Sequence, residues 1–491
     1  MNLIATTRAG KVRGRPTASG MAFLGIPYAA APFGPNRMRP PQPVAPWEGI
    51  RSATEYGPTV PKGRYPAPYR PFFPEITDPG PECLNLNVWT PDPAAGGLPV
   101  LVWIHGGSFT NGSGSVGEYD GSAFAAAGVV CVTINYRLAA EGFLYLRDGH
   151  PNLGLLDQMA ALLWVQDNIT AFGGDPSRVT VAGGSAGAIS AVTLMSMPAA
   201  KGLFSRVIAQ SGAAANTLTI AQGLLVAGHL ADALGVEPTR TAIENVPLQT
   251  LVAAASDLVT EVQTAPDPAK WGAIAVSQLA FAPVVDGDVL VDTPLESLRR
   301  GTAADVPLLI GSNRDEARLF LVAPGLWDHI DADAVAATAA RYGLTSAQAA
   351  AYRANRPEAS HAEILSAIAT DWTFGIPVVR VAEARREATW VYRFDHPEPA
   401  ANNGLGACHG IDLPYIFDTI DRPDVRPRIG DTPSRAVAET MHGLWVSFIT
   451  GNAPGWAPYR IADRAVALIT SQIEEVTDPA ADERQIWEGI R

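Results

Sequence analysis

The segment Gly183-Gly-Ser-Ala-Gly187 constrains the fold of this chain more than any other. It follows a short run with strand composition, residues 178–183, and opens an apolar helical pattern over residues 186–197. A serine at a sharp strand-to-helix turn takes a strained backbone conformation, and flanking glycines let strand and helix approach closely. The segment therefore predicts a turn that exposes Ser185 beside the positive end of a helix dipole.

Strand and helix patterns alternate along the rest of the chain. Apolar runs typical of buried strands occupy residues 98–104, 128–134, 205–210, 306–310 and 389–394. Apolar positions at three- and four-residue steps predict a helix over residues 155–169, which ends at the breaker cluster 172–176. The alternation favours an α/β fold in which helices flank a large, mostly parallel sheet.

Two Ala-rich segments, residues 215–280 and 330–385, have helical patterns and few strand signals. We expect them to be insertions that pack over the sheet and cover a substrate pocket. The Pro-rich stretch from Lys62 to Pro81 is expected to be an irregular surface loop. Because neither repeats nor linker composition divide the chain, residues 1–491 are predicted to form a single domain.

The composition argues against several classes of function. The chain has 36 basic and 49 acidic residues, a formal net charge of −13, which provides no basic surface for nucleic acid or an anionic membrane. No uninterrupted apolar run approaches the roughly 18 residues of a membrane span, and the first residues lack a signal-peptide pattern. The 3 cysteines lie far apart and suggest no disulfide framework. We expect a cytoplasmic protein.

A serine hydroxyl becomes a good nucleophile only when a base takes its proton and an acid orients that base. Of the 8 histidines, His409 lies in a glycine-flanked loop before an apolar run, and His396, just after the strand pattern 389–394, is the runner-up. Cys408 is not expected to pair with His409, since adjacent side chains usually point in different directions. Asp315 and Glu316 follow the strand pattern 306–310, and both qualify as the acid.

The segment His105-Gly-Gly-Ser-Phe109 follows the strand pattern 98–104 and offers unhindered backbone N–H groups. Such groups stabilise the negative charge that develops on a carbonyl oxygen during acyl transfer. The turn at Ser185 offers one more donor, the N–H of Ala186. Together these features favour a serine hydrolase over a plain Gly-rich turn.

These motifs, in this order, resemble the type-B carboxylesterases, an α/β-hydrolase family that includes bacterial p-nitrobenzyl esterases. The resemblance covers nearly the whole chain. It also rests on the segments Phe23–Ala29, Glu82–Trp89, Trp103–Gly107, Asn135–Arg137, Asn152–Gln158, Phe172–Pro176, Gln210–Gly212, Pro283–Gly287 and Asp315-Glu316.

The resemblance implies what the residues alone leave open. Its triad falls on Ser185, Glu316 and His409, and its oxyanion donors fall on Gly107, Ser108 and Ala186. It implies hydrolysis of carboxylic esters through an acyl-enzyme, with neither cofactor nor metal. Hydrolysis of carbamates or aryl amides by the same triad is the alternative, and a non-catalytic interaction module related to cholinesterases is a minor one. The expected partner is a small-molecule ester, bound by a monomer or homodimer.

Three positions depart from the family pattern. Gly184 stands where a glutamate usually precedes the nucleophile, so a carboxylate expected near the histidine is missing. Ser108 stands where a third glycine is common, and we expect its backbone N–H to serve equally well. Cys83 matches a cysteine that is often disulfide-bonded, yet residues 1–82 contain no partner cysteine. The 51–82 segment also lacks a convincing choline-site tryptophan, so cholinesterase activity is not expected.

Overall fold

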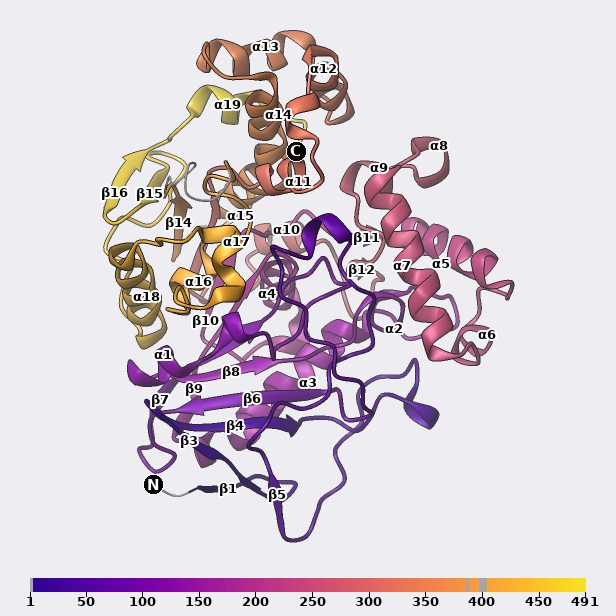
Figure 1. The fold of residues 1–491 in the computed structure, drawn as a ribbon, viewed down its shortest axis with the longest axis vertical. Coiled ribbons are helices and arrows are strands. Elements are labelled where there is room, and N and C mark those ends of the chain that lie inside the picture. The colour runs from indigo at the N-terminus through magenta and orange to yellow at the C-terminus, as the bar shows by residue number, and fades with distance from the viewer. Residues whose placement is uncertain (1–2, 386–387, 397–403) are drawn as a thin grey trace.

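The computed structural model describes residues 3–385, 388–396 and 404–491. Its centre is an 11-stranded sheet (Figure 1). From one edge to the other, the strands are β16 (Ile473–Thr477), β15 (Ala465–Ile469), β14 (Thr389–Phe394), β13 (Leu308–Asn313), β10 (Arg206–Gln210), β9 (Gly174–Gly184), β7 (Leu98–Ile104), β8 (Val130–Ile134), β6 (Asn85–Thr90), β4 (Gly20–Pro27) and β3 (Arg15–Thr17).

Strands β15 through β8 in this order pair in parallel, and antiparallel strands complete both edges. The predicted large, mostly parallel sheet is confirmed. Two small sheets stand beside it. They consist of β1 (Ile4–Thr6), β2 (Lys11–Arg13) and β5 (Ile50–Ser52), and of β11 (Leu218–Thr219) and β12 (Val284–Val285).

Both faces of the sheet are buried, and β7 shows how. Val100, Val102 and Ile104 belong to one apolar core, whereas Leu101 and Trp103 belong to the other, because side chains alternate along a strand. The first core packs against α3 (Leu153–Asn168), α4 (Ala186–Ser196), α10 (Pro294–Arg299) and α15 (Ile376–Ala384). The second packs against α1 (Ser122–Ala126), α16 (Leu413–Ile416) and α18 (Arg435–Thr450).

The two predicted insertions are helical, and in Figure 1 they lie at the right and at the top of the molecule. The first contains α5 (Ile220–Leu234), α6 (Arg240–Glu244), α7 (Leu248–Thr264), α8 (Pro268–Trp271) and α9 (Ile274–Ser277). The second contains α12 (Ala332–Arg341), α13 (Ser346–Asn355) and α14 (His361–Thr370), and continues into α15. Shorter helices are α2 (Ala139–Phe143), α11 (Arg318–Val322), α17 (Arg426–Ile429) and α19 (Ala481–Ile486).

One helical run, His361–Ala384, is by length and composition apolar enough to cross a membrane. Its mean hydropathy of 1.3 comes from apolar residues interspersed with polar ones, which explains why the sequence shows no uninterrupted apolar run. Within its apolar window, 61% is buried inside the protein, and Trp372 and Phe374 are among the buried side chains. This burial is that of a core helix.

Some predictions about individual segments need correction. The strand before Ser185 begins at Gly174 instead of Arg178, because Gly174 pairs with Leu98 of β7 across an irregular register. The stretch from Lys62 to Pro81 is irregular, as expected, apart from the short 3₁₀ turn Ala67–Tyr69. It is not wholly a surface loop, however, since the Lys62 side chain is fully buried.

Candidate active site

Ser185 occupies the predicted turn between β9 and α4. Its backbone has φ 56° and ψ −122°, the strained conformation expected there, and its N–H donates to the carbonyl of Gln210 at 2.8 Å. A Cβ on Gly187 would lie only 1.9 Å from the carbonyl oxygen of Ile104. Only glycine at this position lets α4 pack so closely against β7.

Glu316 and His409 are in direct contact. The Oε2 atom of Glu316 lies 2.6 Å from Nδ1 of His409, and Oε1 accepts the N–H of Asn313 at 2.8 Å. The Glu316 side chain is completely buried, so both carboxylate oxygens are held by the protein. Asp315 instead contacts Arg314 at 2.9 Å and accepts the N–H of Ala407 at 3.1 Å. The structure thus brings Glu316, and not Asp315, to the histidine.

Ser185 and His409 both line one cavity of about 790 Å³, together with Gly107, Ser108 and Ala186. Both helical insertions contribute to its walls, as expected. The lining includes Leu251 and Val259 of α7, and Leu365, Trp372 and Phe374 of the second insertion. The runner-up base, His396, lies outside this cavity and packs against Phe394 and Tyr415.

Two aromatic side chains contact the His409 ring, and the sequence analysis did not identify either of them. The ring centroids of Phe374 and Phe320 lie 4.8 and 5.4 Å from that of His409. With Nδ1 hydrogen-bonded to Glu316 and the ring in tilted contact with Phe374 and Phe320, the imidazole has a defined orientation. Phe320 belongs to α11 and Phe374 to the second insertion. Neither segment gives a sequence signal for the contact, because it depends on how both fold over the sheet.

The glycine-rich segment after β7 forms a tight turn. Gly107, Ser108 and Phe109 have φ values of 114°, 54° and 62°, and the N–H groups of Thr110 and Asn111 both donate to the Gly107 carbonyl at 2.9 Å. Among the hydrogen bonds of the described chain, none uses the N–H of Gly107, Ser108 or Ala186 as donor. These three N–H groups are therefore available to a ligand in the cavity.

His105 supports this turn. Its ring stacks on Tyr136 with centroids 4.5 Å apart, and the Tyr136 hydroxyl donates to the His105 carbonyl at 2.8 Å. Burial lowers the pKa of His105 to about 3, so its ring is neutral at physiological pH. Its role is to shape the loop and not to exchange protons.

The surroundings of Gly184 are apolar. A Cβ placed there would lie 3.2 Å from Leu413 and 3.5 Å from Trp103. A carboxylate is nevertheless buried in this region, that of Asp412, which accepts hydrogen bonds from Gln210 Nε2 at 2.9 Å and Asn313 Nδ2 at 3.1 Å. Burial raises the pKa of Asp412, and the negative charge of Glu316 adds to this effect. The sequence analysis did not identify Asp412.

Cys83, Cys131 and Cys408 are all free and buried, so the disulfide common in the resembled family is absent at Cys83. Burial raises the pKa of Cys408 to about 12, which keeps this thiol protonated beside His409. Within the part of the chain that the structure describes, no group of three or more His, Cys, Asp or Glu side chains is arranged to hold a metal ion.

The site residues follow the carboxyl ends of parallel strands in the centre of the sheet: the glycine-rich turn follows β7, Ser185 follows β9 and Glu316 follows β13. A serine at a strained strand-to-helix turn in such a sheet defines an α/β-hydrolase. Comparisons with known proteins resolve the class further. The sequence model of the Carboxylesterase family matches residues 2–487.

The chain is 36% identical to the para-nitrobenzyl esterase of Bacillus subtilis over 499 aligned positions, which cover 98% of each protein. It is 34% identical to the phenmedipham hydrolase of Pseudarthrobacter oxydans over 96% of each. Among solved structures, the carboxylesterase EST55 of Geobacillus stearothermophilus superposes with a TM-score of 0.86 at 34% identity, covering 99% of this chain and all of that one. This chain belongs to the carboxylesterase family, and it is a carboxylic ester hydrolase.

Proposed function

We propose that Ser185, His409 and Glu316 are the catalytic triad of this esterase. His409 takes the proton of the Ser185 hydroxyl as Oγ attacks the ester carbonyl, and Glu316 stabilises the imidazolium that forms. The N–H groups of Gly107, Ser108 and Ala186 hold the oxyanion. His409 then protonates the leaving alcohol, and water activated by the same base hydrolyses the acyl-enzyme.

The contact between Glu316 and His409 carries this proposal. A buried carboxylate 2.6 Å from Nδ1 favours the tautomer whose other nitrogen, Nε2, is free to accept a proton. The histidine shares its cavity with Ser185, a residue in a strained turn, and with three backbone donors that have no acceptor among the described residues. Each group has the chemistry that its proposed step requires.

The cavity favours esters with apolar groups on either side of the carbonyl. Aromatic and aliphatic side chains surround the two reacting residues, including Phe320, Phe374 and Leu413. Carbamate hydrolysis is the second candidate, because phenmedipham, the compound named in one relative, is a carbamate. Relative rates on matched ester, carbamate and anilide substrates separate these candidates from amide hydrolysis.

The first experiment measures hydrolysis of p-nitrophenyl acetate and butyrate by wild type and Ser185→Ala between pH 5 and 9. We expect turnover and fluorophosphonate labelling in wild type, and neither in the variant, which lacks the nucleophile. Near-full activity in a folded Ser185→Ala variant would refute the assignment. A folded but inert and unlabelled wild type would favour the non-catalytic interaction module.

We also propose that residues 1–491 form a single domain with its two helical insertions and that the enzyme is a cytoplasmic monomer or homodimer. The shared apolar cores on either side of the sheet support the first point. Three buried free thiols fit a reducing compartment. Sedimentation equilibrium at micromolar concentration distinguishes monomer from dimer.

A further inference from the structure

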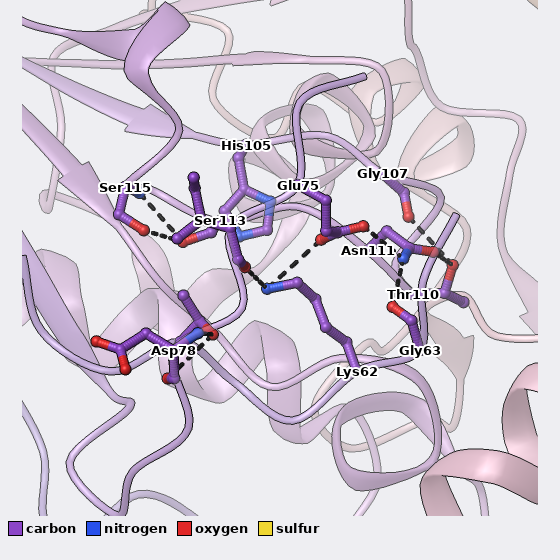
Figure 2. A network of polar contacts seen from close by, with 12 residues as sticks. Lys62, Gly63, Glu75, Asp78, His105, Gly107, Thr110, Asn111, Ser113 and Ser115 are labelled. Atoms are coloured by element: carbon purple, nitrogen blue, oxygen red, sulfur yellow. Dashed lines mark hydrogen bonds and ion pairs between the residues drawn. The ribbon is translucent and has the colours of Figure 1, made fainter. Parts of the chain in front are cut away.

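A lysine is buried beside the glycine-rich turn. The Lys62 side chain has no exposed surface, and its Nζ atom donates to the carbonyl of Ile76 at 2.8 Å and lies 3.5 Å from Oε1 of Glu75 (Figure 2). Burial lowers the pKa of Lys62, while the carboxylate of Glu75 opposes that shift. A buried ammonium is costly unless it is paired, so this arrangement calls for a physical explanation.

The second oxygen of Glu75 reaches the turn itself. Its Oε2 atom accepts a hydrogen bond from Nδ2 of Asn111 at 3.0 Å, and the same Nδ2 donates to the carbonyl of Gly63 at 2.9 Å. Figure 2 shows Lys62, Glu75 and Asn111 linked in this order, and the same amide nitrogen of Asn111 linked to Gly63. The Asn111 side chain is therefore held by two points of the loop formed by residues 62–81.

The backbone of Asn111 in turn closes the turn that carries the free N–H groups. Its N–H donates to the carbonyl of Gly107 at 2.9 Å, and a Cβ on Gly107 would lie 2.3 Å from the Asn111 carbonyl oxygen. The Thr110 hydroxyl donates to Oδ1 of Asn111 at 3.0 Å. Any rotation of Asn111 would consequently turn the Gly107–Ser108 peptide and redirect the N–H of Ser108.

We infer that Lys62, Glu75 and Asn111 form a buried polar clamp that positions the oxyanion donors by tying the Gly107 turn to the 62–81 loop. They are positioning residues, because the side-chain contacts of Lys62 and Asn111, which line the cavity, and of Glu75, which does not, are to the loop, to the adjacent Thr110 and to one another. The inference rests on the proposed function. The same loop supplies Tyr65 and Phe73 to the cavity wall. The clamp thus joins the wall that contacts the substrate to the donors that stabilise its transition state.

The clamp is separable from the closure of the loop. At the base of the loop, the Thr59 N–H donates to the Asp78 carbonyl at 2.7 Å, and the Asp78 N–H donates to the Thr59 hydroxyl at 3.0 Å. These bonds involve none of the clamp residues. Because donor geometry must be accurate to a few tenths of an ångström, loss of the clamp affects the transition state more than the bound substrate.

The test compares Lys62→Met and Glu75→Gln with wild type on p-nitrophenyl butyrate. We expect kcat to fall by about 10- to 100-fold with KM nearly unchanged, because the donors are moved but not removed. Inhibition by a trifluoromethyl ketone, which forms a tetrahedral adduct with the serine, weakens by the same factor as kcat/KM. Glu75→Gln keeps an acceptor for Asn111 and is expected to be milder than Glu75→Leu.

Glu82→Gln is the matched control, since Glu82 makes an exposed ion pair with Arg51 near the end of the same loop. We expect its kcat and its ketone inhibition to equal those of wild type. The inference is overturned if the clamp variants fold but keep wild-type kcat and ketone inhibition. It is also overturned if they change only KM or the melting temperature. If Lys62→Met fails to fold, Glu75→Gln carries the same comparison. An inert, unlabelled wild type instead overturns the proposed function on which the clamp depends.

Discussion

The Nδ1 atom of His409 lies 2.6 Å from Oε2 of Glu316, although 93 positions separate the two residues in the chain. Strands β13 and β14 explain the meeting. They pair in parallel from Leu308 opposite Thr389 to Asn313 opposite Phe394. The carboxyl ends of both strands therefore lie at the same edge of the sheet. The Glu316 turn follows β13 at once, and the chain after β14 returns to the same place through the loop that carries His409.

The first prediction separates the two adjacent carboxylates. Glu316→Gln should lower kcat by about 10³–10⁴-fold, because the amide no longer stabilises the imidazolium and favours the wrong tautomer. Asp315→Asn should retain most of the activity, since Asp315 contacts Arg314 and the backbone of Ala407. Steady-state kinetics of both variants, with circular dichroism as the folding control, checks this. Equal losses in the two variants would contradict the assignment.

The second prediction concerns the turn after β7. Gly107→Ala should reduce kcat/KM by about 10²–10³-fold, as expected when an oxyanion donor is lost. The added Cβ would meet the Asn111 carbonyl oxygen at 2.3 Å on a backbone with φ 114°. Ser108→Gly should stay within about threefold of wild type, because its donor is a backbone N–H and φ 54° suits glycine. A large loss in Ser108→Gly would show that the hydroxyl takes part.

The third prediction addresses the missing carboxylate at position 184. Gly184→Ala should be nearly neutral for stability, because the new Cβ meets the flexible end of Leu413 at 3.2 Å. Gly184→Glu should lower the free energy of unfolding by at least about 2 kcal/mol, since its side chain must start out between Leu413 and Trp103. Urea denaturation of the two variants measures this difference. Equal stability of Gly184→Ala and Gly184→Glu would mean that the glutamate carboxylate finds a polar partner in the folded protein.

The fourth prediction concerns pH and stability. The pKa of Asp371 is raised from 3.8 to about 6, mainly by burial, with a contribution from the charge of Glu483. The hydrogen bond from Tyr352 and the charges of Arg356 and Arg393 oppose the shift. Between these pKa values the folded protein binds more protons than the unfolded chain, so the contribution of Asp371 to stability falls as pH rises from 4 to 6.

Asp371→Asn removes this titration. The difference in melting temperature, variant minus wild type, should therefore rise across the same pH range and level off above pH 6. Differential scanning calorimetry in matched buffers at pH 4, 5, 6 and 7 provides the measurement. A difference in melting temperature that does not depend on pH would contradict the raised pKa.

Local sequence was sufficient for several features of the site. The turn at Ser185 is encoded by residues within a few positions of it, since a glycine is required where α4 crosses β7 and the strand and helix patterns adjoin it directly. The turn after β7 is likewise marked by a local glycine pair, of which Gly107 has a positive φ. Short-range patterns also predicted β7 and β14 with their observed bounds.

Other features depend on contacts between distant segments. Asp315 and Glu316 are equivalent by pattern, and only the pairing of β13 with β14 directs one of them to His409. The burial of Lys62 and its link to Asn111 require a loop to fold back onto a turn that begins some 40 residues later. Sequence alone predicted the central parallel strands and the nucleophile turn, because those depend on local backbone chemistry, and its ordered motifs indicated the family. The tertiary structure decided which carboxylate, which aromatic rings and which buried charges surround the reacting groups, because that choice depends on packing.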